Sequence, residues 1–304
     1  MHVSVHYDYT TVGHVTIDIL ADGTRRAGGS AFYSALQAAR LGQRAHVLTR
    51  GVPEEVRALL EPHRRELSLE VLPATSTTAL QTSGAGAGRR QRVLAWAGPI
   101  AGDRELDTTI LHLAPIARET PRSWRGRAGF VGLTPQGLAR TWGGEGAEMT
   151  LGGDGPAALA PARWDALVVS ERERAACAGL IERSRSLGAV AAITAQDAPT
   201  KVLEPDGPPV LCDVAPAARV RDDLGAGDVF AAALFVALRE GRGAEEAARF
   251  ASAAAALRVE GLGARSIAAR AEVERRLQDS APRLAPSAHE GGSPANGARR
   301  RPPP

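Results

Sequence analysis

A glycine-rich turn is the segment of this chain most suited to chemistry. Residues 222–228 read Asp-Asp-Leu-Gly-Ala-Gly-Asp, and an apolar, alanine-rich stretch with helical character follows at once. Gly225, Ala226 and Gly227 would present N–H groups at a helix N-terminus, where unpaired donors and the helix dipole attract anions. Asp228 stands beside them and could accept a proton, so the pattern suits phosphoryl transfer to a hydroxyl. Taken alone, the segment is equally consistent with a tight loop and an acidic first helical turn.

The elements that must position this turn alternate between short apolar runs and amphipathic stretches. The pattern predicts strands at residues 9–15, 45–49, 69–72, 109–113, 129–133, 166–169 and 190–194. It predicts helices at residues 30–41, 53–62, 171–186, 229–239 and 244–259. Such alternation predicts an α/β fold, a doubly wound and mainly parallel sheet with helices on both faces. Sheets of this kind bind ligands at the carboxyl ends of their strands.

Two extended segments interrupt that alternation, at about residues 15–26 and 77–97. The second carries a Gly-Ala repeat at residues 84–88 between two strand-like runs, which predicts a hairpin. It is not a phosphate loop, because no Gly-Lys-Ser/Thr follows. We expect both segments to form a small β lid on one domain of residues 1–280. Pro, Gly, Ser and Arg dominate residues 281–304, for which we expect a disordered tail.

Composition excludes several classes of protein. The 304 residues are 44% hydrophobic, yet no apolar run is long enough to span a membrane, and the first residues do not resemble a signal peptide. The two cysteines, Cys177 and Cys212, have no metal-binding spacing, which favours a reducing, cytoplasmic setting. The net charge of +3 comes with arginine clusters that lack interleaved aromatic residues. We therefore expect neither a membrane nor a nucleic-acid partner.

Four segments, in order, resemble the motifs of PfkB-type (ribokinase-like) carbohydrate kinases. Residues 222–228 resemble the family's Asp-Thr-Thr-Gly-Ala-Gly-Asp, and residues 28–35 with Leu41-Gly42 resemble its N-terminal Gly-Gly signature. Residues 170–173 are similar to its Asn-x-x-Glu motif. Residues 249–257 followed by Gly263-Ala264 are similar to the helix that closes its nucleotide pocket. The Gly-Gly segment is more similar to the myo-inositol kinase-like branch than to ribokinase proper.

The resemblance implies an enzyme that transfers a phosphoryl group from ATP with Mg²⁺. Asp228 would be the base, and Gly225, Ala226 and Gly227 would form the anion hole. Glu173 would organise the metal and the phosphates through water, although a solvated carboxylate at a helix start is the alternative. Some relatives hold a monovalent cation near the position of Asp222, and the sequence leaves open whether this chain does.

The resemblance also implies residues for both ligands. A carboxylate after the first strand, here Asp18, would accept hydrogen bonds from substrate hydroxyls, and an exposed turn residue is the alternative. The other implied substrate-binding residues are Gly28, Gly29 and Tyr33. The implied nucleotide-binding residues are Ser170, Glu173, Thr194, Ser252 and Gly263.

This chain departs from the family at several of these positions. Tyr33 stands where the family has an Asn that contacts sugar hydroxyls, and Ser170 and Ser252 also replace Asn. Residues 194–199 align with a Thr-x-Gly-x-x-Gly loop, yet both glycines are replaced, by Gln196 and Pro199. These changes put the acceptor and the nucleotide preference in question.

The sequence thus predicts an ATP-dependent kinase for a hydroxyl of a sugar, inositol or nucleoside. Its small-molecule partners would be that polyol and ATP, and it would be a monomer or a homodimer through the lid. The alternative is a catalytically impaired ligand-binding or regulatory protein on the same fold, because fold alone does not decide function.

Overall fold

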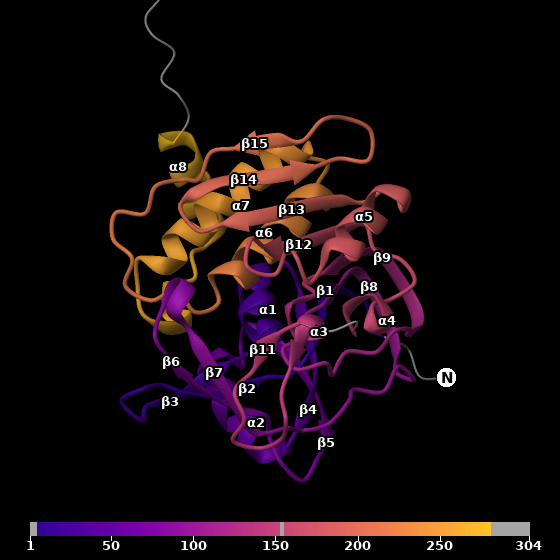
Figure 1. Cartoon of the computed structure of the whole chain (residues 1–304), viewed down its shortest axis with the longest axis vertical. Coiled ribbons are helices and arrows are strands. Elements are labelled where there is room, and N and C mark those ends of the chain that lie inside the picture. Colours follow the sequence, from indigo (N-terminus) through magenta and orange to yellow (C-terminus); the bar gives the residue numbers. More distant parts are fainter. Residues whose placement is uncertain (1–4, 153–154, 281–304) are drawn as a thin grey trace, which may run out of the picture.

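A nine-stranded sheet forms the centre of the computed structural model, which describes residues 5–152 and 155–280 (Figure 1). The strand order is β15-β14-β13-β12-β9-β8-β1-β4-β5. All neighbours from β13 to β5 pair in parallel, whereas β14 and β15 are antiparallel. The strands are β1 (Tyr7–Val12), β4 (Ala45–Gly51), β5 (Leu67–Pro73), β8 (Glu105–Leu113), β9 (Arg125–Leu133), β12 (Ala166–Ser170), β13 (Val190–Ala195), β14 (Ala198–Leu203) and β15 (Val210–Cys212).

Helices cover both faces of this sheet, as predicted. One hydrophobic cluster joins the sheet to α1 (Ser30–Arg40), α2 (Pro53–Leu60), α6 (Ala226–Arg239), α7 (Ala244–Val259) and α8 (Arg270–Asp279). A second cluster joins the other face to α3 (Gln136–Ala139), α4 (Gly155–Leu159) and α5 (Ala178–Ser186). Strand β12 shows why a strand covered on both faces carries consecutive apolar residues: Val168 packs into the first cluster, and Leu167 and Val169 pack into the second.

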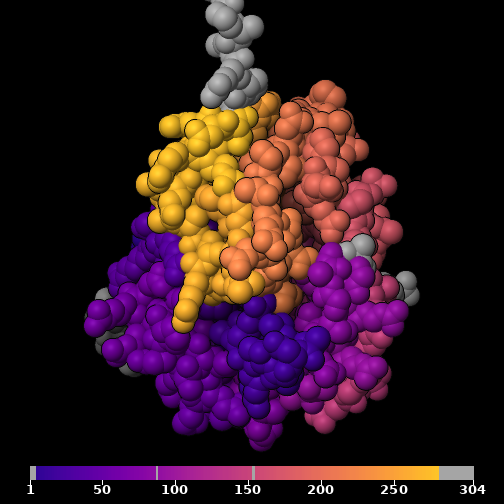
Figure 2. Space-filling view, turned by 90° about the vertical axis from the view of Figure 1, so that its left-hand side faces the viewer, coloured from indigo at the N-terminus to yellow at the C-terminus, as the bar shows by residue number. Residues whose placement is uncertain are grey.

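A second sheet of four strands forms the lid, in the order β3-β2-β6-β7. Its strands are β2 (Thr16–Ile19), β3 (Arg25–Gly28), β6 (Ala79–Ser83) and β7 (Arg90–Ala95). These ranges lie within or next to the two segments that the sequence assigned to the lid. Figure 1 places the lid strands together beside the lower half of the large sheet. In Figure 2 the indigo and purple N-terminal half lies beneath the orange and yellow C-terminal segments.

Several element boundaries differ from the sequence predictions. Helix α5 begins at Ala178 and not at residue 171, because turns occupy residues 171–177. There the carboxylate of Glu173 accepts the N–H of Ser170 at 2.9 Å. The strands β14 and β15, the helices α3, α4 and α8, and the two-residue strands β10 (Arg140–Thr141) and β11 (Thr150–Leu151) were not predicted. The expected tail at residues 281–304 lies outside the described residues.

No helix among the described residues combines the length and the apolar character needed to cross a membrane.

Candidate active site

The N-terminus of α6 presents unpaired backbone donors, as the sequence predicted. Among the described residues, the N–H groups of Gly225, Gly227 and Asp228 have no backbone acceptor. The N–H of Ala226 makes only a long contact of 3.4 Å with the carbonyl oxygen of Asp223. Three N–H groups at the start of this 14-residue helix are therefore available to an anion, and that of Ala226 is held only by a long hydrogen bond.

Gly225 is required by both backbone conformation and packing. Its φ is +79°, in the left-handed region that disfavours side chains. A Cβ atom at this position would lie 2.4 Å from Cγ of Tyr33, so the Tyr33 ring packs directly against the turn. Tyr33 is 2% exposed, burial raises the pKa of its hydroxyl, and that hydroxyl has no hydrogen-bond partner among the described residues. Its predicted contact with the acceptor remains a prediction.

Asp228 lies in the first turn of α6, close to other ionisable side chains. Burial raises the pKa of its carboxyl from 3.8 to about 6. A hydrogen bond from Ser30 and the charge of Arg140 lower this pKa, and the negative charges of Glu173 and Asp18 raise it. The structure thus brings three predicted carboxylates into one site. A carboxyl with a pKa near neutrality suits general-base chemistry.

Helix α1 orients Asp228 through two serines on one face. Ser30, the first residue of α1, provides the hydrogen bond to the Asp228 carboxylate. One turn later, the hydroxyl of Ser34 donates to the backbone carbonyl of Asp228 at 3.2 Å. Residues four apart share a helix face, so both serines face α6. The sequence analysis assigned neither serine a role, although both lie in the Gly-Gly segment.

Asp18 is buried in the lid strand β2 and is not an exposed turn residue. Its side chain accepts a hydrogen bond of 2.7 Å from Thr16, and burial raises the pKa of its carboxyl. The carboxylate lies over Gly28, where a Cβ atom would come within 2.1 Å of Asp18 Oδ2. At Gly29, φ is +94° and a Cβ atom would lie 2.2 Å from the carbonyl oxygen of His14. The packing of the chain itself therefore requires both glycines.

Glu173 is also buried, which excludes the alternative of a solvated helix-start carboxylate. It is 6% exposed and does not begin a helix, because α5 starts five residues later. Its Oε1 accepts a hydrogen bond of 2.8 Å from Gln136, and its Oε2 accepts the N–H of Ser170 at 2.9 Å. Gln136 is the first residue of the short helix α3, which follows β9. These two contacts fix the carboxylate near Asp228.

The predicted nucleotide-binding residues separate into two groups. Ser170 and Thr194 are register partners at the carboxyl ends of β12 and β13, where the fold places a ligand site. Ser252 is buried, and its hydroxyl accepts the N–H of Ala215 at 2.8 Å. The N–H of Gly263 donates to Asp222 at 2.9 Å. Ser252 and Gly263 thus hold loops in place in this structure.

Gln196 takes the conformation that a glycine would take in the two-residue turn between β13 and β14. Its φ is +53°, although it carries a side chain. Left-handed backbone costs a residue other than glycine about 1 kcal/mol. We therefore expect Gln196→Gly to raise the free energy of unfolding by up to about 1 kcal/mol, measured by urea denaturation. Asp197→Gly, in the same turn with an ordinary φ, is the control and should not stabilise the protein.

The tip of the lid hairpin contacts the segment before the anion-hole turn. Arg89 forms an ion pair with Asp223, and the N–H of Gly86 donates to the same carboxylate at 2.9 Å. Arg172, which follows β12, donates to the carbonyl oxygen of Gly86 at 3.1 Å. A Cβ atom at Gly86 would lie 3.2 Å from the side chain of Gln196. The hairpin tip therefore lies beside Asp223, Arg172 and Gln196.

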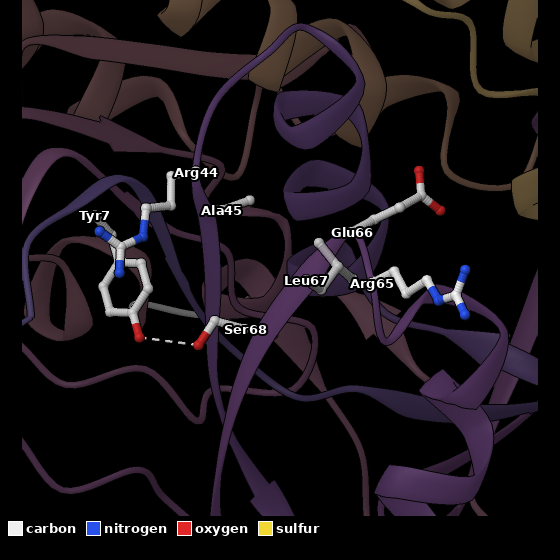
Figure 3. A pocket seen from close by; sticks show the side chains of 7 residues that line it. All are labelled: Tyr7, Arg44, Ala45, Arg65, Glu66, Leu67 and Ser68. Atoms are coloured by element: carbon white, nitrogen blue, oxygen red, sulfur yellow. Dashed lines mark hydrogen bonds between the residues drawn. The ribbon is translucent and has the colours of Figure 1, made fainter.

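Two hollows on the described surface lie away from this site. One hollow of about 410 Å³ lies at the amino ends of β1, β4 and β5, with Tyr7, Arg44 and Ser68 in its wall. Figure 3 shows the Tyr7 hydroxyl hydrogen-bonded to Ser68, at 2.9 Å. The other, about 500 Å³, lies beside α5. Because ligands of such sheets bind at the carboxyl ends, the α6 turn remains the candidate site.

Comparisons with known proteins concern the family and the fold. Residues 174–270 match the model of the pfkB family of carbohydrate kinases. A segment of 56 residues is 52% identical to a ribokinase of Arabidopsis thaliana and covers 18% of this chain. The same segment spans 15% of the length of that ribokinase.

Solved structures share the fold over most of the chain. A pyrophosphate-dependent kinase in the ribokinase family superposes with a TM-score of 0.66 at 20% identity, covering 88% of this chain and 99% of its own. The Arabidopsis thaliana ribokinase with ribose and ATP gives a TM-score of 0.63 at 19% identity, with 90% and 99% covered. A pyrophosphate-dependent myo-inositol-1 kinase converted into a myo-inositol-3 kinase gives 0.65 at 19% identity, with 90% and 99% covered.

The fold is therefore ribokinase-like, with a large, mainly parallel sheet and a small β lid. The predicted resemblance to PfkB-type carbohydrate kinases is confirmed by the family match and by these structures. Together they support the prediction of a carbohydrate kinase.

Proposed function

We propose that this protein is a phosphotransferase that phosphorylates a hydroxyl of a sugar, inositol or nucleoside. One observation carries the proposal: Asp228, whose pKa is raised to about 6, lies beside consecutive free N–H groups at the start of α6. A base and an anion cradle in contact form the minimal machinery for transfer to an alcohol. The ribokinase-like fold and the family match to residues 174–270 support it.

Each residue then has a defined step. The acceptor hydroxyl lies against Asp228, which takes its proton as the oxygen attacks the terminal phosphorus atom. The bond from that phosphorus to the bridging oxygen breaks, and the leaving phosphate carries away the electron pair. The N–H groups of Gly225, Ala226 and Gly227 stabilise the charge on the transferring phosphoryl oxygens. Asp18, Gly28, Gly29 and Tyr33 are the proposed walls of the acceptor site.

ATP with Mg²⁺ is the proposed donor. Mg²⁺ would neutralise phosphate charge, and it needs few protein ligands because it keeps several waters. Each Glu173 oxygen accepts one hydrogen bond and retains a lone pair for a metal-bound water. Ser170 and Thr194 lie at the strand ends proposed for the nucleotide.

Pyrophosphate is a second candidate donor. Gln196 and Pro199 replace the glycines of the nucleotide loop, and the lid tip lies against Gln196. Both features reduce the room expected for a nucleoside. Three solved structures with the same fold are described as pyrophosphate-dependent kinases, one of them complexed with a pyrophosphate analog and myo-inositol. A catalytically impaired binding protein is the remaining alternative.

A donor–acceptor screen tests these proposals. The protein is incubated with Mg²⁺ and either ATP or pyrophosphate against panels of sugars, inositols and nucleosides, and phosphorylated acceptor is measured by mass spectrometry. ATP use yields one ADP per product, whereas pyrophosphate use yields one orthophosphate. Asp228→Asn is the blank. Binding of an acceptor without product for either donor would favour the impaired protein.

The raised pKa of Asp228 also predicts the pH dependence of turnover. Because burial raises this pKa to about 6, the carboxyl is protonated below that pH and cannot accept the hydroxyl proton. We expect kcat/KM to be flat from pH 7 to 8 and to fall about tenfold per pH unit below about 6. Initial rates in overlapping buffers measure this. A profile that stays flat down to pH 4.5 would contradict the assignment of Asp228 as the base.

A further inference from the structure

A buried arginine lies directly behind the anion-hole turn. Arg258, near the end of α7, has a fully buried side chain. Its Nη2 donates to Asp222 Oδ2 at 3.2 Å and to the carbonyl oxygen of Leu224. Its Nη1 donates to the carbonyl oxygen of Asp222 at 3.2 Å and to the hydroxyl of Ser266 at 3.1 Å. One guanidinium therefore binds four oxygen atoms, three of them in the segment that leads into Gly225.

These oxygens are the kind of ligand that a monovalent cation would need. Backbone carbonyls and carboxylates replace the hydration shell of such an ion. Here the guanidinium already binds them, and its planar shape fills the space between them. The Asp222 carboxylate also accepts hydrogen bonds from Arg26 at 2.8 Å and from the N–H groups of Leu224 and Gly263 at 3.0 and 2.9 Å. The residues around Asp222 thus do not fit an additional cation.

The charges at this point support the same conclusion. Burial alone would raise the pKa of Asp222, but hydrogen bonds from Arg26 and from the backbone of Gly263 and Leu224, with the charge of Arg258, hold it well below its usual range. Asp222 is therefore ionised, and Arg26 and Arg258 supply two positive charges to its one negative charge. A third cation would add repulsion to a site that already carries a net positive charge.

The same contacts fix the direction of the turn. The carbonyl groups of Asp222 and Leu224 both point to Arg258, on the interior side. The free N–H groups of the α6 start follow directly after Leu224, and Gly225 reverses the backbone with its positive φ. The Tyr33 ring packs against that glycine and also lies beneath the Arg258 guanidinium, 5.3 Å from its Cζ. Arg258 can therefore hold the donors in the orientation that an anion requires.

We propose that Arg258 is the internal cation that positions the anion hole, so that phosphate binding and turnover need no monovalent cation. Arg258 is a positioning residue, because it contacts neither ligand. The turnover part rests on the function proposed above, whereas the binding part does not. The proposal concerns a residue that the sequence analysis did not single out.

The first test uses the unmodified protein. Affinity for pyrophosphate is measured by calorimetry, and kcat/KM by product formation, in choline chloride, NaCl, KCl and NH₄Cl at equal ionic strength with Mg²⁺ constant. We expect all values to agree within about twofold, since screening is the same in each salt. A tenfold or larger gain in affinity or turnover on replacing choline by K⁺ would overturn the proposal.

The second test removes the guanidinium. Arg258→Ser is expected to weaken pyrophosphate binding and lower kcat/KM at least about 100-fold, because the turn loses three hydrogen bonds. Adding millimolar guanidinium or K⁺ should raise the pyrophosphate affinity and the kcat/KM of Arg258→Ser at least tenfold. Arg239→Ser, at the exposed C-terminal end of α6, is the control and should respond to neither ion. A folded Arg258→Ser protein with unchanged binding would contradict the proposal.

The two readouts separate this proposal from the proposed function. If no acceptor is ever phosphorylated, the pyrophosphate affinity in the four salts still decides whether the anion site depends on a monovalent cation. If Arg258→Ser does not fold, Arg258→Lys and the salt series on the parent protein remain decisive. Lysine keeps the charge but not the planar fork, so we expect partial loss of affinity without dependence on K⁺.

Discussion

Replacing Asp228 with asparagine is expected to abolish phosphoryl transfer while making the protein more stable at pH 8. Loss of a positioned base lowers rates by about 10²–10⁴-fold. The amide keeps the size of the side chain and can still accept the hydrogen bond from Ser30. Acceptor and donor affinities should therefore change little, because the N–H groups of the α6 turn and the walls of the acceptor site are untouched.

The stability gain follows from the direction of the pKa shift. Burial raises the folded-state pKa from 3.8 to about 6, so the ionised carboxylate disfavours folding at pH 8. A shift of about two pKa units corresponds to at most about 3 kcal/mol in the free energy of unfolding. Asparagine carries no charge at pH 8, so the Asp228→Asn protein would gain this stability. The gain should shrink as the pH falls through 6 and vanish below about 4, where both states are protonated.

Urea unfolding at pH 8 and pH 4, combined with rates at pH 8, measures both effects. Asp206→Asn, at an exposed turn between β14 and β15, is the control for loss of a carboxylate and should alter neither rate nor stability. Turnover equal to that of the parent would remove Asp228 from the mechanism. Equal stabilisation at pH 8 and pH 4 would show that the charge of this group is not the cause.

The parts of the fold and site that could be predicted from sequence have local causes. Strands such as β12 are apolar over residues 166–169 because helices cover both faces of the sheet, so a short apolar run identifies them. The glycines within residues 222–228 predict the turn from the sequence alone. Helix α7 was predicted at residues 244–259, where the structure has it.

What the sequence could not show depends on contacts between distant segments. Arg258 and Asp222 are 36 residues apart, and an arginine in an alanine-rich helix ordinarily faces solvent. Arg140 acts on the pKa of Asp228 from another edge of the site, with no motif around it. Strand β14 escaped prediction because its first two residues are exposed and Pro199, Thr200 and Lys201 interrupt its apolar residues. The contacts of Arg258 and Arg140 therefore follow from the three-dimensional structure and not from a sequence motif.

Glu173 shows a related limit. The sequence predicted a site role for Glu173, three residues after Ser170, and a helix over residues 171–186. Turns occupy residues 171–177 instead. The carboxylate accepts the N–H of Ser170, a contact that also occurs at helix N-termini, so it does not account for the turns.

Gly225→Ala is expected to be the most damaging single-methyl change in the turn. The residue has a φ of +79°, which costs an alanine about 1 kcal/mol or more. The new methyl group would also lie 2.4 Å from the buried Tyr33 ring, and overpacking of this kind costs about 1–3 kcal/mol. We expect a loss of about 3 kcal/mol in unfolding free energy and at least a 100-fold loss of kcat/KM as the N–H groups turn away.

Gly227→Ala is the matched control, two residues further along the same turn. It lies inside α6 without a positive φ, and no atom lies within 4 Å of a Cβ placed there. Its stability should change by less than about 1 kcal/mol, and in the stabilising direction, because alanine favours helix. The double variant Gly225→Ala/Tyr33→Ala should lose less stability than the sum of its single changes, since removing the ring removes the clash. Additive losses, or equal losses for Gly225→Ala and Gly227→Ala, would show that Tyr33 does not restrict the turn.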